Sequence, residues 1–185
     1  PLVADHVDLS GVRRVADLGG GPGHYLAEFA RRSPRIEPYL IDLPLTLQVA
    51  RRVLAETEVF PRIHFVEWDF YAAEPPAGLA SFDLVYLSSV LHSESPEKNR
   101  ALLQRIFRLV VPGGRVVVQE NVVEPGRTSP PEAALFAVNM LASTPAGRTY
   151  TEGEVLAWGE AAGFVRETGE RLSGRSYLIR MRRPG

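Results

Sequence analysis

Residues 15–23 read Val-Ala-Asp-Leu-Gly-Gly-Gly-Pro-Gly, and they decide the fold of this 185-residue chain. The apolar residues around the aspartate are typical of the end of a short buried strand, and the glycines after them predict a tight turn. Gly19, Gly21 and Gly23 let the backbone bend sharply and approach a ligand closely. Pro22 stands where a helix can begin, because the amide that proline lacks has no partner in a first helical turn. The stretch therefore predicts a strand, a glycine-rich turn and a helix.

A glycine turn of this kind suits an adenosyl or nucleotide cofactor, although the spacing G-x-G-x-G differs from the dinucleotide fingerprint G-x-G-x-x-G. A packing turn without a ligand is the alternative. A second apolar run ends at Asp42, about 20 residues after the turn, where an acid can accept hydrogen bonds from ribose hydroxyls. The two features together favour a bound cofactor with Asp42 on its ribose. The other role open to Asp42 is the N-cap of a helix that begins at Pro44.

Size and composition exclude several classes of function. A chain of 185 residues has the size of one domain with a substantial core. The net charge of −1, without a basic cluster, predicts no nucleic-acid partner. The chain contains no cysteine, which excludes disulfides, thiolate nucleophiles and zinc bound by cysteine, and no cluster of histidine and carboxylates has the spacing of metal ligands. Without a signal peptide or an apolar run of the ~20 residues that span a bilayer, we expect no membrane partner and a cytoplasmic location.

Apolar runs between turn residues predict strands, and apolar residues at helical spacing predict helices. The expected strands are 12–18, 36–41, 63–66, 82–87, 115–119, 164–170 and 177–181. The expected helices are 24–32, 44–56, 96–109, 132–141 and 152–162. Loops are expected at 72–80 and 127–131, and turns at Pro112-Gly113-Gly114 and Ser173-Gly174. This alternation predicts an α/β fold with a doubly wound, mostly parallel sheet that ends in an antiparallel hairpin.

Two polar residues are expected at the carboxyl edge of this sheet. His92 stands just past the fourth strand, at the edge where open α/β sheets bind ligands, and an imidazole can accept a proton at physiological pH. It is a candidate general base, whereas a histidine that only caps or lines the next helix is the alternative. Glu120 leaves the fifth strand at the same edge and could orient the imidazole ring, or it could be a solvated acid at a strand end. His6, His24 and His64 lack such a context and are expected in surface or packing positions.

These features resemble the class I S-adenosylmethionine-dependent methyltransferases. More narrowly, the chain is similar to the catalytic domain of small-molecule O-methyltransferases of the plant caffeate and bacterial polyketide types. The resemblance covers nearly the whole chain and rests on the order and spacing of these motifs: Asp17-Leu-Gly-Gly-Gly-Pro-Gly23, Asp42-Leu-Pro44, Asp69-Phe70, Val90-Leu-His92, Val111-Pro-Gly-Gly114, Glu120 with Pro125, and Gly147 to Thr151.

The resemblance implies a seven-stranded sheet of order 3-2-1-4-5-7-6 with an antiparallel last strand. It also implies that residues 1–185 form the catalytic domain, and that the N-terminal winged-helix domain of the family, which dimerises and helps to close the substrate pocket, is absent from this chain. A homodimer is therefore among the expected assemblies, especially where an upstream domain exists.

The cofactor implied by the resemblance is S-adenosyl-L-methionine, with S-adenosyl-L-homocysteine as the product. Asp69 would accept a hydrogen bond from the exocyclic amine of adenine while Phe70 packs on the ring. Asp17 would order the turn or meet the methionine amino group through water, and Ser88 would add a hydroxyl or carbonyl. The positions that would bind the cofactor are Asp17, Gly19, Gly21, Gly23, Asp42, Leu43, Asp69, Phe70 and Ser88.

On the acceptor side, Asn139, Met140 and residues 142–146 would line the pocket by the same alignment. Met140 could equally be an ordinary core residue. Other positions depart from the pattern of the family near its catalytic residues: Ser88, Ser89, Ser93, Glu94, Ala137 and Thr149.

The leading hypothesis is methyl transfer to a small aromatic or polyketide-like hydroxyl, with His92 as general base and Glu120 beside it. The alternatives are a cofactor-binding module without methyl-transfer activity, an N- or C-methyltransferase, and a nicotinamide-dependent oxidoreductase, which the glycine spacing disfavours.

Overall fold

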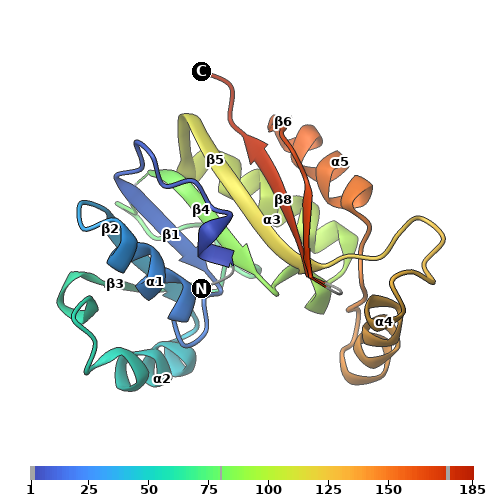
Figure 1. The fold of residues 1–185 in the computed structure, drawn as a ribbon, viewed down its shortest axis with the longest axis horizontal. Helices are drawn as coiled ribbons and strands as arrows, with labels where there is room; N and C mark the ends of the chain where they lie inside the picture. The colour runs from blue at the N-terminus through green and yellow to red at the C-terminus, as the bar shows by residue number, and fades with distance from the viewer. Residues whose placement is uncertain (1–2, 80, 174–175) are drawn as a thin grey trace.

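A mixed sheet of eight strands forms the centre of the computed structural model, which describes residues 3–79, 81–173 and 176–185 (Figure 1). The strands are β1 (Arg14–Leu18), β2 (Glu37–Asp42), β3 (His64–Glu67), β4 (Phe82–Ser88), β5 (Val110–Asn121), β6 (Val165–Arg166), β7 (Glu170–Ser173) and β8 (Ser176–Arg182). Their order is β3-β2-β1-β4-β5-β8-β6, with β7 paired to β8 outside this path. Strands β1 to β5 pair with one another in parallel, whereas β8 is antiparallel to β5, β6 and β7.

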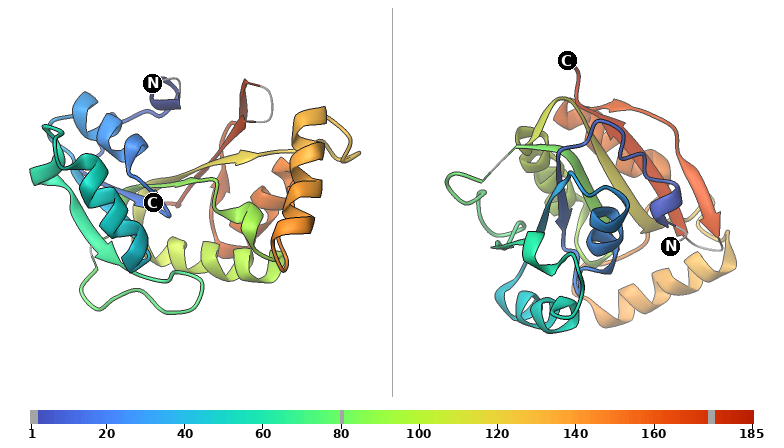
Figure 2. Two further views of the ribbon diagram at one scale, coloured as in Figure 1. Left: turned by 90° about the horizontal axis from the view of Figure 1, so that it is seen from below. Right: turned by 60° about the vertical axis from the view of Figure 1, so that its left-hand side comes forward.

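Helices cover both faces of this sheet. The α-helices are α1 (His24–Arg32), α2 (Pro44–Leu54), α3 (Pro96–Leu109), α4 (Pro131–Ser143) and α5 (Glu152–Ala162). Short 3-10 helices are η1 (Val3–Asp5), η2 (Phe60–Arg62) and η3 (Leu91–Ser93). The apolar sides of α1 and α2 pack into one core cluster, and those of α3 and α5 pack into the other, so the fold has three layers (Figure 2).

The fold class and the strand order expected from the sequence are confirmed, with one additional short strand. Helix and strand ends lie within about two residues of the predicted ones for most elements, which is the usual uncertainty of such boundaries. The side chain of Thr151 accepts the amide of Glu154, and the Glu154 side chain returns to the amide of Thr151, so a complete capping box begins α5. Ala80, in the predicted loop 72–80, lies outside the described residues.

The prediction of a separate turn before the fifth strand is wrong, because β5 already begins at Val110. The register jumps from the pair Phe82–Val110 to the pair Leu84–Arg115, so the Pro-Gly-Gly segment bulges out of the ladder with β4. Its amides and carbonyls instead reach the C-terminal end of the chain. The amide of Gly113 donates to the carbonyl of Arg183, for example, at 3.0 Å.

The predicted strand 164–170 is also corrected, because it consists of two separate pieces, β6 and β7, along the outer edge of β8. Gly169 lies between them and packs so closely that an added Cβ would lie 2.8 Å from Tyr177 Cε1. The antiparallel hairpin of β7 and β8 is as predicted, while Gly174 of the predicted turn lies outside the described residues.

The carboxyl ends of β1, β2, β4 and β5 meet at one edge of the sheet. Figure 1 shows α2 and α4 at the two sides of this edge, with α4 standing out from the rest of the fold. Three large apolar residues of α4 point into solvent: Leu135, Val138 and Leu141 are 71%, 63% and 77% exposed. Two helices thus border the edge of the sheet at which ligands bind to α/β proteins.

Candidate active site

The glycine turn joins the end of β1 to the start of α1 and forms one wall of the site. Gly19 has a φ of 74°, and a Cβ added to it would lie 2.7 Å from Val90 Cγ2 and 3.2 Å from Phe70 Cζ. Glycine is therefore required at this position for the backbone conformation and for the close approach. Gly23, with a φ of 82°, is the N-cap of α1. The sequence predicted Pro22 in the first turn of the helix, but it lies in the loop before the helix begins.

Asp42 connects the glycine turn to the end of β2. Its Oδ2 accepts a hydrogen bond from the amide of Gly21 at 3.0 Å, and its Oδ1 accepts one from the amide of Leu43 at 2.7 Å. The alternative role of Asp42 as the N-cap of α2 is wrong, since Leu43 is the N-cap and no side chain caps that helix. Each carboxylate oxygen keeps acceptor capacity beyond one backbone amide, so Asp42 can still accept bonds from a ligand.

Asp17 lies beneath the glycine turn, fully buried. A Cβ added to Gly20 would lie 2.5 Å from Oδ2 of Asp17, which shows how closely the turn covers this carboxylate. Within the described part of the chain, neither oxygen has a hydrogen-bond partner of ordinary geometry. Burial, and then the charge of Asp42, raise the pKa of Asp17 to about 7, while the backbone of Leu26 acts weakly in the other direction. Asp17 thus supports the turn from below and does not line the pocket.

A pocket of about 460 Å³ opens in front of this turn. Its lining residues are Gly19, Asp42, Leu43, Asp69, Phe70, Tyr71, Ala72, Ser89, Val90, Ser93, Glu94 and Lys98. Five of the residues that the sequence predicts for a cofactor site are brought together here, namely Gly19, Asp42, Leu43, Asp69 and Phe70. Four others lie outside the lining, namely Asp17, Gly21, Gly23 and Ser88.

The segment after β3 forms the opposite wall. Oδ1 of Asp69 accepts the amides of Tyr71 and Ala72, both at 3.1 Å, so the carboxylate shapes the turn. Phe70 packs edge-on against Trp68 and contacts the core with most of its surface. The sequence did not indicate Tyr71 and Ala72 as pocket residues, although their position directly after Asp69 and Phe70 could have done so.

At the end of β4, the structure places Ser88 one residue short of the pocket. The ladder pairs Ser88 with Gln119, and the Ser88 hydroxyl donates to Gln119 Oε1 at 3.2 Å. Ser89 follows with a φ of 59° and lines the pocket in its place. Lys98, which the sequence did not indicate either, comes from the first turn of α3 and pairs with Glu94 at 2.7 Å.

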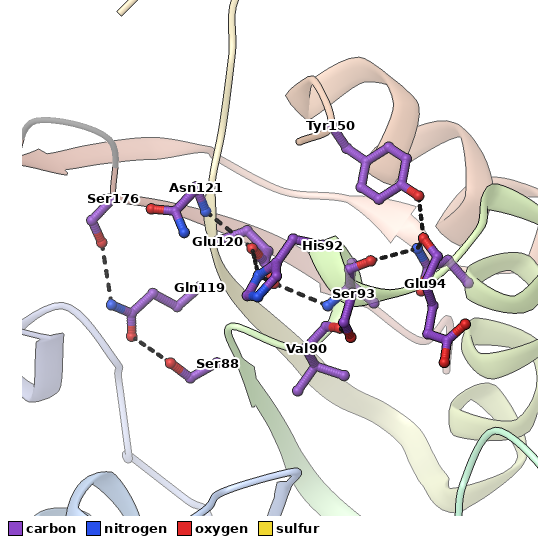
Figure 3. A network of polar contacts seen from close by, with 12 residues as sticks. Ser88, Val90, His92, Ser93, Glu94, Gln119, Glu120, Asn121, Tyr150 and Ser176 are labelled. Atoms are coloured by element: carbon purple, nitrogen blue, oxygen red, sulfur yellow. Dashed lines mark hydrogen bonds and ion pairs between the residues drawn. The ribbon is translucent and has the colours of Figure 1, made fainter. Parts of the chain in front are cut away.

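His92 and Glu120 face each other beside this pocket, as Figure 3 shows. Nδ1 of His92 lies 2.9 Å from Oε2 and 3.2 Å from Oε1 of Glu120. The carboxylate is 4% exposed, and it also accepts the amides of Leu91 at 2.9 Å and Asn121 at 3.1 Å. The sequence thus predicted correctly that both residues reach the same edge, and the alternative of a solvated Glu120 is wrong.

The polar network fixes the chemistry of the imidazole. The carboxylate of Glu120 accepts at both oxygens, so Nδ1 of His92 carries the proton, and Nε2 of the neutral ring is left as the acceptor nitrogen. The ring of Phe136, from α4, packs edge-on against the imidazole at 5.0 Å. A partly buried imidazole with an oriented acceptor nitrogen can take a proton from a bound hydroxyl.

Of the residues predicted for the acceptor side, Asn139, Met140 and residues 142–143 belong to α4, and residues 144–146 follow it. Asn139 is exposed, while Met140 is 8% exposed and packs inward, and neither lines the pocket described above. Thr149, one of the positions expected to depart from the family pattern, is buried with a hydroxyl that has no hydrogen-bond partner among the described residues. Its neighbour Arg148 donates its amide to the carbonyl of His92 at 2.8 Å, so this segment borders the histidine turn.

Residues 3–79, 81–173 and 176–185 hold no group of three or more histidine and carboxylate side chains arranged to bind a metal ion. They also include no helix with the length and apolar character needed to cross a membrane.

Comparison with known proteins gives consistent matches. A family model described as an O-methyltransferase domain matches residues 2–165. The chain is 37% identical over 161 residues to 3-hydroxy-5-methyl-1-naphthoate 3-O-methyltransferase from Streptomyces sahachiroi, covering 87% of this chain and 46% of that protein. It is 36% identical over 170 residues to acetylserotonin O-methyltransferase from Gallus gallus, covering 92% and 47% of the two chains. The chain therefore spans about half the length of these relatives.

Among solved structures, the fold is similar to that of human N-acetylserotonin methyltransferase in complex with SAM. The two superpose with a TM-score of 0.87 at 28% sequence identity, covering all of this chain and 51% of the other. The similarity thus extends over the whole sheet and its helices.

Proposed function

The chain belongs to the O-methyltransferase family, and from that premise we propose that it transfers a methyl group from S-adenosyl-L-methionine to a hydroxyl of a small aromatic or polyketide-like molecule. The observation that carries this proposal is the pair His92–Glu120, which lies beside a pocket bordered by Gly19, Asp42 and Phe70. The relatives named for a naphthoate and for acetylserotonin support an aromatic acceptor.

The pocket fits an adenosyl group in size and chemistry. Its volume of about 460 Å³ lies within the range of small-molecule sites, which is roughly 300–1,000 Å³. Asp42 would accept hydrogen bonds from the ribose diol, and Asp69 would accept one from the adenine amine at its Oδ2. Phe70 and Leu43 would pack against the base. Gly19 leaves space where any side chain would collide with the pocket wall.

The residues beside the pocket can activate a hydroxyl. When bound, the sulfonium group supplies a methyl carbon whose bond to sulfur breaks as its bond to the acceptor oxygen forms. Nε2 of His92 would receive the hydroxyl proton, which makes the oxygen a better nucleophile. Glu120 holds the ring in the productive tautomer through Nδ1 and stabilises the imidazolium that results. Orientation of the two reactants within the site would supply much of the remaining rate acceleration.

The acceptor would lie between the pocket and α4. Phe136 already contacts His92 from this side, and Met140, at 8% exposure, would add only the edge of an adaptable apolar side chain. Asn139 would line the same space as a polar residue. The homodimer, the assignment of residues 1–185 as a catalytic domain, and the cytoplasmic location remain predictions from the sequence.

Two measurements on the purified chain test the proposal. Calorimetry with S-adenosyl-L-homocysteine measures binding to the pocket, and transfer of a labelled methyl group is followed with a panel of naphthols, phenols, amines and carbon nucleophiles. We expect S-adenosyl-L-homocysteine to bind and the methyl group to be transferred to phenolic oxygen. We expect His92→Ala to lower turnover while affinity for S-adenosyl-L-homocysteine is retained. Binding without transfer to any acceptor would favour a cofactor-binding module, and transfer to nitrogen or carbon alone would favour the other methyltransferase classes. A thermal shift with NAD but none with S-adenosyl-L-methionine would instead reinstate the oxidoreductase.

A further inference from the structure

Asn99 is a fully buried polar residue in α3 that is not part of the site described above. Its Nδ2 donates to the carbonyl of Leu91 at 2.9 Å, and its Oδ1 accepts the hydroxyl of Tyr71 at 2.7 Å. A buried amide with a partner on each side is a defined link between two segments.

The two segments that Asn99 joins belong to the two halves of the site. Leu91 is the first residue of η3, the turn that carries His92 as its second residue. Tyr71 lines the pocket in front of the glycine turn. Asn99 therefore bridges the turn of the proposed base and the wall of the proposed cofactor pocket.

The chemistry of the partners fixes the orientation of this amide. A backbone carbonyl can only accept, so the NH2 group of Asn99 must face Leu91, and its oxygen must face Tyr71. The Tyr71 hydroxyl must then be the donor. Burial, and then the charges of Glu94 and Glu120, raise the pKa of Tyr71 well above its ordinary value, so the hydroxyl keeps its proton.

Other contacts hold the remaining polar groups of η3 from different directions. The amide of Leu91 donates to Glu120, and the carbonyl of His92 accepts the amide of Arg148. The carbonyl of Glu94, just after η3, accepts the hydroxyl of Tyr150 (Figure 3). Asn99 also reaches the Glu94 carbonyl weakly, at 3.5 Å. Its distinct contribution is the connection to Tyr71.

We propose that Asn99 is a positioning residue, which holds η3, and with it His92, at a fixed place relative to the pocket wall at Tyr71. The proposal rests on the proposed function for its effect on turnover. Because a shift of about 1 Å in a reacting group can cost on the order of 100-fold in rate, loss of this link affects turnover more than ligand affinity.

The test compares Asn99→Leu with Gln104→Leu, a matched amide-to-alkyl change on the exposed side of the same helix. For Asn99→Leu we expect kcat to fall on the order of 10-fold to 100-fold, while the Kd for S-adenosyl-L-homocysteine stays within about 2-fold. The 15N signals of the His92 ring, assigned by their absence in His92→Gln, should move in the unliganded protein. Gln104→Leu should change none of these quantities.

Unchanged kcat and His92 signals in a folded Asn99→Leu variant would overturn the proposal. A fall in affinity for S-adenosyl-L-homocysteine as large as the fall in kcat would also overturn it, since Asn99 would then only support the pocket. If Asn99→Leu does not fold, Tyr71→Phe decides, because it removes the link while the bond between Asn99 and Leu91 is kept. It should move the His92 signals, and unmoved signals would contradict the proposal. If the wild-type chain transfers no methyl group, the proposed function fails, but the comparison of His92 signals still tests Asn99.

Discussion

Nδ1 of His92 donates to the buried carboxylate of Glu120 at 2.9 Å, and the backbone amides of Leu91 and Asn121 donate to the same carboxylate. Glu120 therefore receives three donors and offers the imidazole one fixed orientation. An amide in its place would turn its NH2 group toward one of these donors, and the ring would lose either its tautomer or its position.

The first prediction concerns Glu120→Gln, which has the same shape as the wild type. We expect kcat to fall by about 100-fold or more, since loss of an orienting acid can leave the histidine in the wrong tautomer. The Kd for S-adenosyl-L-homocysteine, measured by calorimetry, should change by less than about 2-fold. Glu124→Gln is the control, because Glu124 is an exposed acid a few residues further along the chain. Full activity in Glu120→Gln would show that the carboxylate has no part in turnover.

The second prediction concerns Asp42→Asn. The substitution weakens the bonds from Gly21 and Leu43 and removes the charge that would face a ribose diol. Hydrogen bonds to a charged group contribute about 1.5–3 kcal/mol, so affinity for S-adenosyl-L-homocysteine should fall by roughly 10-fold to 100-fold. Calorimetry on the folded variant measures the loss.

Asp83→Asn is the matched control for Asp42. Its Oδ2 accepts two backbone amides, those of Arg13 at 2.9 Å and Arg14 at 2.8 Å, but it lies at the opposite edge of the sheet. Asp83→Asn should therefore lower stability without weakening ligand binding. If Asp42→Asn and Asp83→Asn bind S-adenosyl-L-homocysteine equally well, Asp42 does not contribute to ligand binding.

The third prediction separates backbone strain from steric collision in the glycine turn. Gly19 and Gly11 have similar φ values, 74° and 72°, but an added Cβ collides with Val90 at Gly19 and meets nothing within 4 Å at Gly11. Both alanine variants bear the strain of a left-handed residue, about 1–2 kcal/mol. Gly19→Ala should lose further stability in urea unfolding and should also bind S-adenosyl-L-homocysteine more weakly. If Gly11→Ala loses as much stability and as much affinity for S-adenosyl-L-homocysteine, the close approach at Gly19 contributes to neither.

The parts of the fold that the sequence predicted are those with a local cause. The apolar run before Asp17 and the glycines after it define β1 and its turn, and apolar spacing defines α1. The shared edge of His92 and Glu120 also followed from the sequence, because the carboxyl ends of parallel strands meet at one edge. Their direct contact depends on the register that pairs β4 with β5.

The parts that the sequence could not predict depend on tertiary packing. Ser88 was expected at the pocket, but its pairing with Gln119 keeps it within the sheet, and the turn begins one residue later. The link between Asn99 and Tyr71 joins residues that are 28 positions apart, and no local pattern marks either of them. The division into β6 and β7 likewise appears only in the pairing with β8, and Gly169, between the two strands, packs closely against Tyr177.

The last prediction concerns the pH dependence of stability caused by Asp17. Its pKa is about 7 in the folded protein and 3.8 ordinarily. Below about pH 4 the group is protonated in both states. As the pH rises toward 7, the unfolded chain ionises while the folded protein keeps the proton, so the free energy of unfolding falls by about 1.4 kcal/mol per pH unit. Above pH 7 both states are ionised and the loss is complete.

Asp17→Asn removes this titration, so the difference in unfolding free energy between wild type and variant should fall steadily from pH 5 to pH 7 and level off by pH 8. Urea unfolding at each pH measures it. Asp8→Asn is the control. Hydrogen bonds from Ser10, and then Arg115, lower the pKa of Asp8 to about 2, so this group is ionised in both states throughout the range and its difference should be flat. A flat difference for Asp17→Asn as well would mean that the carboxylate under the glycine turn does not titrate there, and that burial is offset by contacts it makes in solution.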